Sequence, residues 1–374
     1  MDFSLDEDQK TFLKLAQAFV KKLDLQKGFS PELIKRAWEA GFLSMSIPEE
    51  QGGLALDPLT IALIIEEIAY GCGGLAVAIR VSGMANEAIA AYGNSAQKER
   101  YLTPFTQRPM LASFCVTETE AGSDIPAMRT FIKKRDDGKY VLNGTKRFIS
   151  NANYAEQFIV FCKLGDPESK FMVCLIAPKD PEEGEIEIGK PSGELDRHFL
   201  NMADVAFKDV VIDPSQIIGD RRCGFNYFLN ALDFSRTMMA AVGCGVARKA
   251  YDLTLNYTKS RVQFGQRICD LPVAREMLVK MFNKAKTAYV ATMHAAWKLK
   301  NGDRDKAVHA AMAKNLAAEA AIFNGKEGLH LHGGYGFMRE YEIARLVLEG
   351  HIIETGEGTR EILSMIQGRE IIQQ

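Results

Sequence analysis

The spacing of apolar residues changes twice along the chain, and these changes restrict the folds available to it. Up to about residue 102, apolar residues recur with the period of an amphipathic helix, as in PELIKRAWEAGFL. From about residue 110 to 220 the apolar segments are short and rich in β-branched and aromatic residues, as in EQFIVFCKL, which is typical of strands. From about residue 225 the helical period returns in long runs such as DKAVHAAMAKNLAAEAAIFNGKEG, which suggest a bundle of long helices.

We therefore predict an α+β fold that is mostly α. Its expected parts are an N-terminal α-helical domain over residues 1–109, a middle antiparallel β domain over residues 110–220 and a C-terminal helical bundle over residues 221–374. The length of 374 residues agrees with two or three domains, since one domain usually takes about 100–200 residues.

Composition and charge exclude several classes of function. The formal net charge of −2 gives no electrostatic reason to expect nucleic acid or an anionic membrane as a partner. Seven cysteines without a Cys-x-x-Cys pair argue against a disulfide framework or a zinc site and for a reducing compartment. The opening residues MDFSLDEDQK resemble neither a signal nor a transit peptide. The apolar run LTIALIIEEIAY is too short to span a bilayer and holds two glutamates, so we expect a cytoplasmic protein.

The stretch HIIETGEGTREIL places Glu357 between Gly356 and Gly358 in an otherwise helical pattern. Each glycine costs a helix about 1 kcal/mol relative to alanine, so the helix should break here. One interpretation is a helix-ending turn followed by a new helix that Thr359 caps, with Glu361 in its first turn. The other is a break that offers the Glu357 carboxylate and backbone N–H groups to a ligand. The residues alone leave both open.

Several familiar sites are excluded by their context. GCGVAR at residues 243–248 and HGGYGF at residues 332–337 share glycines with dinucleotide-binding loops, but neither follows a predicted strand. His330, His332 and His351 have no carboxylate or cysteine at ligand spacing. We therefore predict no metal site.

Three further segments combine hydroxyl groups, aromatic rings and glycines. FCVTETEAGSD begins as a strand and ends in a turn, and RFISNAN pairs an aromatic residue with Ser150. Each is either an ordinary strand end or an edge whose hydroxyl and N–H groups bind a flat heteroaromatic ring. SRVQFGQ follows a long predicted helix. Either Arg261 forms a surface ion pair and Phe264 is a core aromatic residue, or Arg261 binds a pyrophosphate, whose geometry a guanidinium matches.

In their order and spacing, these segments resemble motifs of the acyl-CoA dehydrogenase flavoprotein family, and the resemblance covers essentially the whole chain. FCVTETEAGSD is similar to the family's T-E-P-x-A-G-S-D signature and SRVQFGQ to its R-x-x-F-G-x segment. HLHGGYGFMREY is similar to Q-x-x-G-G-x-G-x-x-x-E-Y, and GEGT to Y-E-G-T. The resemblance implies a C-terminal four-helix bundle and FAD as cofactor, bound between domains and across a subunit interface of a homo-oligomer, usually a tetramer.

The resemblance also implies roles for individual residues. Glu357 takes the place of the catalytic base, and Asp233 and Arg236 would approach the adenine end of the thioester substrate. The implied cofactor-binding residues are Val116, Thr117, Gly122, Ser123, Phe148, Ser150, Arg261, Gln263, Phe264, His330, Gly334, Thr359 and Glu361. The implied substrate-binding residues are Ser123, Asp233, Arg236 and Gly358.

The implied reaction removes a weakly acidic α-proton from acyl-CoA. Hydrogen bonds to the thioester carbonyl would stabilise the developing enolate, and one such donor is worth about 3–4 kcal/mol in other enzymes. Burial is expected to raise the pKa of the Glu357 carboxyl. The flavin takes the β-hydrogen as hydride and leaves the 2-enoyl thioester, with an electron-transferring flavoprotein as the expected acceptor. Some relatives carry the base at the position of Ser235 here, where serine cannot serve.

The chain departs from the family pattern near the expected site. Thr119 replaces a proline, His330 a glutamine and Gly356 the tyrosine before the base, while Leu348-Glu349 replaces an Arg-Asp pair. These changes point to an acyl group of unusual shape.

Alternative functions are open at this stage. One keeps the chemistry but places the acyl group on a carrier protein, which predicts a weakened adenine pocket and a basic docking patch. The others are an oxidase that uses O₂ directly and an inactive flavin-binding relative. Arg80, in AIRVSG, is either a surface residue or a group that binds a substrate carboxylate.

Overall fold

The computed structural model describes residues 4–23, 29–191 and 201–373. The chain divides into two compact units. The helical unit consists of Met1–Asp24, Asp57–Val77 and Asp233–Gln374, and the sheet unit of Leu25–Leu56 and Ala78–Leu232. The boundary between them falls within two helices, α4 (Gly73–Tyr92) and α7 (Gly224–Ser260).

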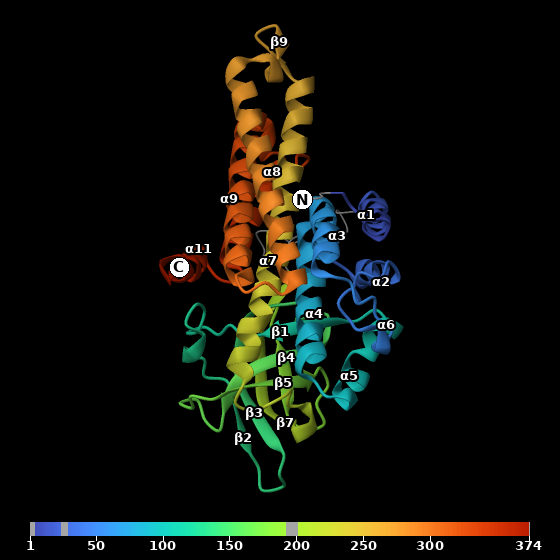
Figure 1. The fold of residues 1–374 in the computed structure, drawn as a ribbon, viewed down its shortest axis with the longest axis vertical. Helices are drawn as coiled ribbons and strands as arrows, with labels where there is room; N and C mark the ends of the chain where they lie inside the picture. Colours follow the sequence, from blue (N-terminus) through green and yellow to red (C-terminus); the bar gives the residue numbers. More distant parts are fainter. Residues whose placement is uncertain (1–3, 24–28, 192–200, 374) are drawn as a thin grey trace. The chain divides into compact units, whose positions relative to one another are not determined.

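The helical unit is built on long helices, and α7, α8 and α9 run alongside one another in it (Figure 1). Helix α9 packs against α8, α10 and α11, and α3 packs against α1 and α8. Besides α7, its helices are α1 (Glu7–Val20), α3 (Pro58–Gly71), α8 (Pro272–Asn301), α9 (Lys306–His332), α10 (Ile343–Thr355) and α11 (Arg360–Gln373). No helix in the described ranges is long and apolar enough to cross a membrane.

The glycines of GCGVAR lie inside α7, where they allow close packing of helices. A Cβ atom on Gly243 would lie 2.9 Å from the Cβ of Ala317 on α9. A Cβ atom on Gly245 would lie 2.3 Å from the backbone oxygen of Glu66 on α3. A side chain at either position would push these helices apart, so the glycines serve packing and not a nucleotide loop.

The apolar run LTIALIIEEIAY forms most of α3, and its two glutamates are held by one arginine. Asp57 begins the helix by accepting hydrogen bonds from the N–H groups of Leu59 and Thr60. The carboxylates of Glu66 and Glu67 are buried, and Arg248 of α7 donates to them at 2.8 and 2.7 Å. An unpaired buried charge is very unfavourable, so the pairing with Arg248 explains how Glu66 and Glu67 can be accommodated on a helix whose residues are mostly buried.

The sheet unit contains a seven-stranded sheet in the order β1-β4-β2-β3-β7-β6, with β5 also paired to β4. The strands are β1 (Leu111–Cys115), β2 (Phe131–Lys134), β3 (Tyr140–Ser150), β4 (Ala155–Leu164), β5 (Met172–Pro178), β6 (Glu185–Ile188) and β7 (Met202–Ile212). Helices α2 (Pro31–Glu39), α5 (Ser95–Tyr101) and α6 (Thr103–Gln107) and the larger part of α4 belong to the same unit.

The predicted fold class, helical regions before and after a β region, is confirmed. One detail differs, because the sheet is mixed and not purely antiparallel. Strands β1 and β2 both pair parallel with β4, whereas the other pairs are antiparallel. Alternating residues mark a strand but not its direction, which depends on connections that are distant in sequence.

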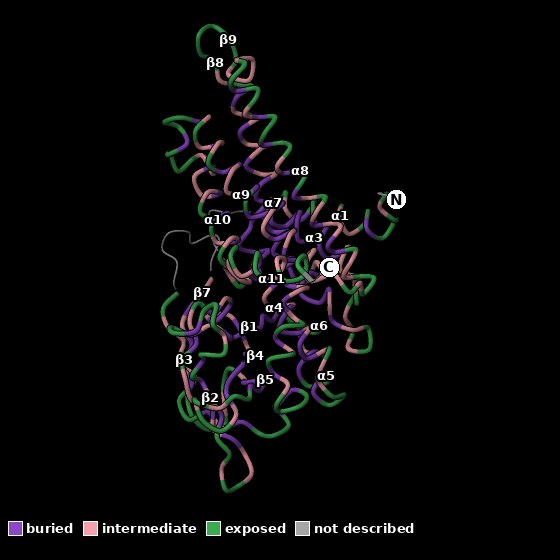
Figure 2. The backbone as a smooth tube through the Cα atoms, turned by 60° about the vertical axis from the view of Figure 1, so that its left-hand side comes forward, coloured by how far each residue is buried: buried purple, intermediate pink, exposed green. Residues whose placement is uncertain are grey.

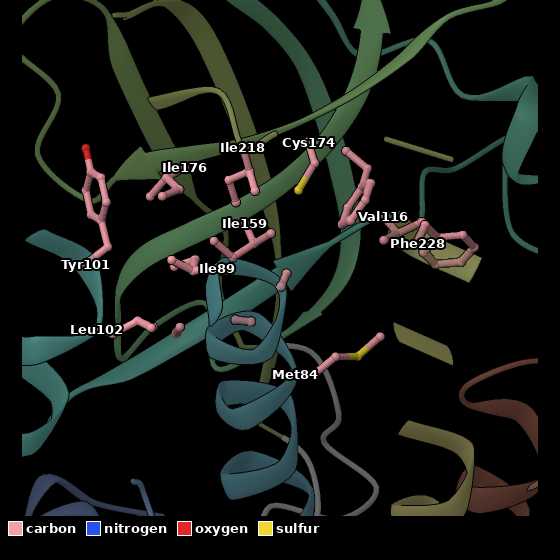
Figure 3. Close-up of a cluster of buried hydrophobic side chains, with 14 of the residues drawn as sticks. Met84, Ile89, Tyr101, Leu102, Val116, Ile159, Cys174, Ile176, Ile218 and Phe228 are labelled. Carbon is pink, nitrogen blue, oxygen red and sulfur yellow. The ribbon is translucent and has the colours of Figure 1, made fainter. Parts of the chain in front are cut away.

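Strand β4 is buried on both faces and joins two apolar clusters. On one face, Ile159 packs with Ile176 of β5 and with Met84 and Ile89 of α4 (Figure 3). On the other face, alternate residues such as Phe158 belong to a second cluster that β3 and β7 share. Burial on both faces explains why the segment EQFIVFCKL is almost continuously apolar.

Candidate active site

The Gly-Glu-Gly stretch forms a strained turn between α10 and α11. Glu357 adopts a positive φ of 59° and Gly358 one of 99°, whereas Gly356 has an ordinary φ of −67°. The side-chain oxygen of Thr359 accepts a hydrogen bond from the N–H of Ile362 at 3.4 Å, which confirms the predicted helix stop and cap. A positive φ on a residue other than glycine costs about 1–3 kcal/mol and is concentrated at functional sites.

Two cations hold the backbone of this turn. Lys314 of α9 donates from Nζ to the backbone oxygens of Glu354 at 2.6 Å and Gly358 at 2.7 Å. Arg236 of α7 donates from Nε to the backbone oxygen of Glu357 at 3.3 Å. Positive side chains therefore contact the carbonyl of Glu357 itself, that of Glu354 before it and that of Gly358 after it.

Burial perturbs the charged groups behind the turn. Desolvation lowers the pKa of Lys314 to about 8, although the nearby Glu357 carboxylate opposes this shift. Burial also lowers the pKa of Arg236, and it raises the pKa of Asp233, which lies 3.6 Å from Arg236. The structure thus brings the predicted substrate residues Asp233 and Arg236 to the Glu357 turn, and their contact with adenine stays a prediction.

An open depression of about 420 Å³ lies where α9 ends, beside the segment that follows α7. Predicted diphosphate-binding residues from both segments line it together: Arg261 and Gln263 from one, His330 and Gly334 from the other. A Cβ atom on Gly334 would meet nothing within 4 Å, so the backbone is open to a ligand there. A guanidinium, an amide and accessible backbone suit an anionic group.

The predicted residue Phe264 occupies the tip of a small hairpin at this end of the helical unit. Strands β8 (Val262–Gln263) and β9 (Gln266–Arg267) pair antiparallel, and the tip is exposed (Figure 2). Phe264 and Gly265 both have positive φ, 52° and 75°, as a type I′ turn requires. The Phe264 side chain is 91% exposed, so within this chain the ring projects into solvent.

An aromatic cluster supports the floor of the depression. Tyr257 stacks on His332 with ring centroids 4.2 Å apart, and the Arg261 guanidinium lies 5.3 Å from the centroid of Tyr335. Since a carbonyl only accepts, Nδ1 of His332 carries the proton that it shares with the backbone oxygen of Gly328 at 2.7 Å. Burial lowers the pKa of His332, which keeps the ring neutral and stacked at pH 7.

In the sheet unit, the structure brings the predicted flavin-ring residues together. The N–H of Arg147 donates to the backbone oxygen of Thr117 at 2.8 Å, which joins the segment after β1 to β3. Val116 is buried and Phe148, with a positive φ of 58°, is 52% exposed. Ser150 ends β3 and is half-buried. Apolar, aromatic and hydroxyl-bearing residues are thus present at this edge, and their contact with a flavin ring stays a prediction.

A buried ion pair fixes this edge from behind. Lys146 of β3 is fully buried, and its Nζ donates to the backbone oxygen of Val116 and to the carboxylate of Glu118, each at 2.8 Å. Glu118 also accepts from the N–H groups of Arg129 at 2.6 Å and Thr130 at 3.1 Å. Burial disfavours the charge on Glu118, but Lys146 and these donors outweigh it and keep the pKa of Glu118 below its usual range.

The remaining predicted residues lie at the surface or are already paired. Gly122 and Ser123 are exposed in the turn that follows Glu118, and Glu361 is exposed and paired with Arg360 at 3.1 Å. The surface interpretation of Arg80 is wrong. Its side chain is buried and makes a bidentate pair with Glu87 at 2.9 and 3.1 Å, so this edge of the guanidinium is bound by a carboxylate of the protein itself.

Three supporting residues were missed from the sequence: Lys314, Lys146 and Tyr257. His332 was considered only as a metal ligand. A signal existed for Lys314, because it lies at helical spacing from the buried residues Ala310, Ala317 and Ala321 in an alanine-rich run. For Lys146 the signal was weaker, namely an inward position in a strand. Lysines are rarely fully buried, so both patterns favour a surface side chain when taken alone.

Models of three domains match the chain: acyl-CoA dehydrogenase N-terminal domain over residues 6–108, middle domain over residues 113–210 and C-terminal domain over residues 222–372. The probable acyl-CoA dehydrogenase YngJ of Bacillus subtilis is 33% identical over 384 residues, covering 100% of both chains. Butyryl-CoA dehydrogenase from Megasphaera elsdenii has a structure with a TM-score of 0.94, 30% identity and 100% coverage of both chains. The prolyl acyl carrier protein oxidase AnaB has a TM-score of 0.91 and 26% identity, covering 98% of this chain and 100% of AnaB. The chain belongs to the acyl-CoA dehydrogenase family.

Proposed function

We propose that this protein is an FAD-dependent dehydrogenase that converts an acyl-CoA thioester to the 2-enoyl-CoA, with Glu357 as the catalytic base. The observation that carries the proposal is the conformation of Glu357. Its positive φ of 59° is held by Arg236 and Lys314 through carbonyls within and beside the turn. A protein that maintains a strained glutamate in this way has a use for that carboxylate.

The residues around the depression fit the diphosphate of FAD. Arg261 supplies a permanent positive charge, Gln263 and His330 supply hydrogen-bonding groups, and Gly334 leaves space for close approach of phosphate oxygens. The candidate ring contacts Val116, Thr117, Phe148 and Ser150 are gathered at one edge of the sheet unit. Bound FAD would supply the acceptor for the β-hydrogen, which leaves the substrate as hydride.

The turn provides both functions that proton abstraction requires. The Glu357 carboxylate takes the α-proton, and the N–H of Gly358 would donate to the thioester oxygen as negative charge develops there. A donor of this kind contributes about 3–4 kcal/mol to the transition state in other enzymes. Arg236 and Lys314 prevent the turn from relaxing, so both groups are oriented before the substrate arrives.

The alternative is an acyl group carried by a protein, which the likeness to AnaB favours. The presence of Asp233 and Arg236 does not discriminate between the carriers. Arg236 binds the backbone of Glu357 and lies close to Asp233, so both residues support the base whichever carrier delivers the acyl group. The CoA substrate stays our first choice because the butyryl-CoA dehydrogenase matches the complete chain at higher identity.

The proposed partners follow from the same family. An electron-transferring flavoprotein would reoxidise the flavin, and a second copy of the chain would complete the cofactor site. The exposed side chains of Phe264 and Val262 on the hairpin beside the open depression support this second proposal, because a partner chain would cover them. We propose a homotetramer.

The test is an anaerobic titration of the FAD-loaded protein, with flavin absorbance as the readout. Linear, branched, alicyclic and dicarboxylic acyl-CoAs are compared with the same acyl groups on a carrier protein. Rapid bleaching by one acyl-CoA would support the proposal and identify the acyl class. Bleaching only by carrier-bound acyl groups would favour the alternative. Failure to bind FAD at all would refute both.

A further inference from the structure

Lys314 lies outside every family motif in the sequence, yet it makes the shortest contacts to the turn that bears Glu357. Its side chain is fully buried, and its Nζ bridges the backbone oxygens of Glu354 and Gly358 at 2.6 and 2.7 Å. We propose that Lys314 is a positioning residue that holds Glu357 in the conformation from which it acts as a base. This inference rests on the proposed function of Glu357.

The two carbonyls are on opposite sides of Glu357. Glu354 belongs to the last turn of α10, where backbone oxygens have no partner within the helix. Gly358 follows Glu357 and leads into α11. One ammonium group therefore connects the two ends of the turn. Its positive charge also interacts favourably with the negative, C-terminal end of the α10 helix dipole.

Arg236 cannot replace this contact. It approaches from α7 and binds the oxygen of Glu357 itself, at the longer distance of 3.3 Å. It therefore fixes one peptide of the turn but does not connect the two ends. Without Lys314, the oxygens of Glu354 and Gly358 would lose a buried charged donor, and Glu357 could leave its unfavourable positive-φ conformation.

Charged groups from every neighbouring element act on Lys314. They are Glu357 in the turn, Arg236 of α7, Glu354 of α10 and Glu361 of α11. Burial lowers its pKa to about 8, and Glu357 is the strongest influence in the opposite direction. Below pH 8 the ammonium is present; above pH 8 it is lost, and the turn loses its charged donor.

The decisive experiment compares Lys314→Met and Lys314→Gln with wild type in the FAD-loaded full-length protein. Lys163→Met is the matched control, because Lys163 is also buried and donates to a backbone oxygen, that of Pro126, at 2.7 Å in the sheet unit. The first readout is amide hydrogen exchange of peptides that cover residues 355–360. The second is flavin reduction at saturating acyl-CoA between pH 6 and pH 9.5.

We expect exchange in residues 355–360 to be at least about tenfold faster in both Lys314 variants and unchanged in the control. The reduction rate should fall by about tenfold or more with little change in KM, because orientation and not binding is lost. The decline in wild-type rate as pH rises through about 8 should disappear in Lys314→Met. Lys314→Arg should recover part of the rate.

Unchanged exchange in residues 355–360 would overturn the proposal, as would a rate loss that appears only in KM. Exchange is measured without substrate, so it tests Lys314 even if no acyl thioester reduces the wild-type flavin. That last result would refute the proposed function and leave the structural role of Lys314 to be decided by exchange. If Lys314→Met does not fold, Lys314→Gln is compared with wild type in the same two measurements, since glutamine retains a hydrogen-bond donor but no charge.

Discussion

The Nε atom of Arg236 lies 3.3 Å from the backbone oxygen of Glu357, although 121 positions separate the two residues. The guanidinium is buried, and it also lies 3.6 Å from the carboxylate of Asp233. Arg236, for which the family resemblance implied a contact with the adenine end of the substrate, therefore lies against the backbone of the proposed base. The long helix α7 and the turn after α10 are coupled at this contact.

Replacing Arg236 should impair both turnover and folding. In Arg236→Met, the Glu357 oxygen loses a charged donor and Asp233 loses its buried partner, so we expect flavin reduction to slow by about tenfold to a hundredfold. The free energy of unfolding should fall by about 1–3 kcal/mol. Stopped-flow reduction and urea denaturation measure the two effects. Arg236→Lys retains the charge, so its reduction rate should lie between those of wild type and Arg236→Met. A wild-type reduction rate in Arg236→Met would contradict the proposed role of Arg236.

The Lys146–Glu118 pair should contribute stability that depends on pH. Lys146→Met leaves Glu118 buried without its partner and should cost about 3–5 kcal/mol in urea unfolding at pH 7. The pKa of Glu118 is lowered by the fold, so its contribution is present above its ordinary value of 4.5 and is lost as pH falls through the folded value.

The control for this prediction is the double variant Lys146→Met/Glu118→Gln, which removes both charges. It should be more stable than Lys146→Met alone at pH 7, because no unpaired charge remains. The difference between the two variants should shrink as falling pH protonates Glu118, because the charge of this group is what makes the single variant less stable. A difference that persists at low pH would show that packing, and not charge, sets the stability.

The two glycines beside Glu357 should respond differently to alanine. Gly356 has an ordinary φ of −67°, and an added Cβ would lie 3.4 Å from the Ile352 oxygen and 3.6 Å from the Met239 Cε. Gly358 has a φ of 99°, which an L-residue rarely adopts. Gly358→Ala should therefore lose about 1 kcal/mol or more of stability and most of the reduction rate.

Gly356→Ala is the matched comparison and should retain its stability within about 0.5 kcal/mol. This substitution should change which acyl groups are accepted. Gly356 stands where the family motif has a tyrosine, and the glycine leaves space that Met239 borders. The acyl-CoA panel provides the measurement. Equal loss of stability in both variants would mean that backbone conformation is not what distinguishes the two glycines.

Phe264 should matter for assembly and cofactor binding, and not for the fold of one chain. We expect Phe264→Ala to raise the dissociation constant for FAD by about tenfold and to shift the protein toward smaller oligomers, because a fully exposed ring gains its contacts only from a partner. Light scattering after size-exclusion chromatography and flavin fluorescence measure these changes. Phe171→Ala removes another exposed aromatic ring, in the sheet unit, and should alter neither.

Local signals explain why some parts of the site could be predicted. Glycines and a capping threonine determine the turn around Glu357, because such a turn depends on backbone preferences of adjacent residues. The periodicity of apolar residues likewise gave the helical and β regions. These features need no knowledge of distant contacts. The hairpin at Phe264 was not predicted, since phenylalanine is not a residue that favours a positive φ.

Long-range packing determines what the sequence did not reveal. Lys314 and Lys146 are buried because helices and strands far away in sequence enclose them, and local patterns place lysine at the surface. The surface interpretation of Arg80 failed for the same reason, since its burial and its pairing with Glu87 depend on packing within the unit. The parallel pairing of β1 and β2 with β4 depends on chain connections, which alternating residues do not encode.

The central claim, that Glu357 removes the α-proton, can be tested apart from hydride transfer. FAD-loaded protein is incubated in D₂O with the acyl-CoA that reduces its flavin, and the incorporation of deuterium at the α-carbon is followed by NMR. Wild type should exchange the α-hydrogen, and Glu357→Gln should slow exchange by about a thousandfold or more while it still binds the ligand. Glu370→Gln, which changes an exposed carboxylate on α11, should exchange like wild type. Exchange at the wild-type rate in Glu357→Gln would show that another group is the base.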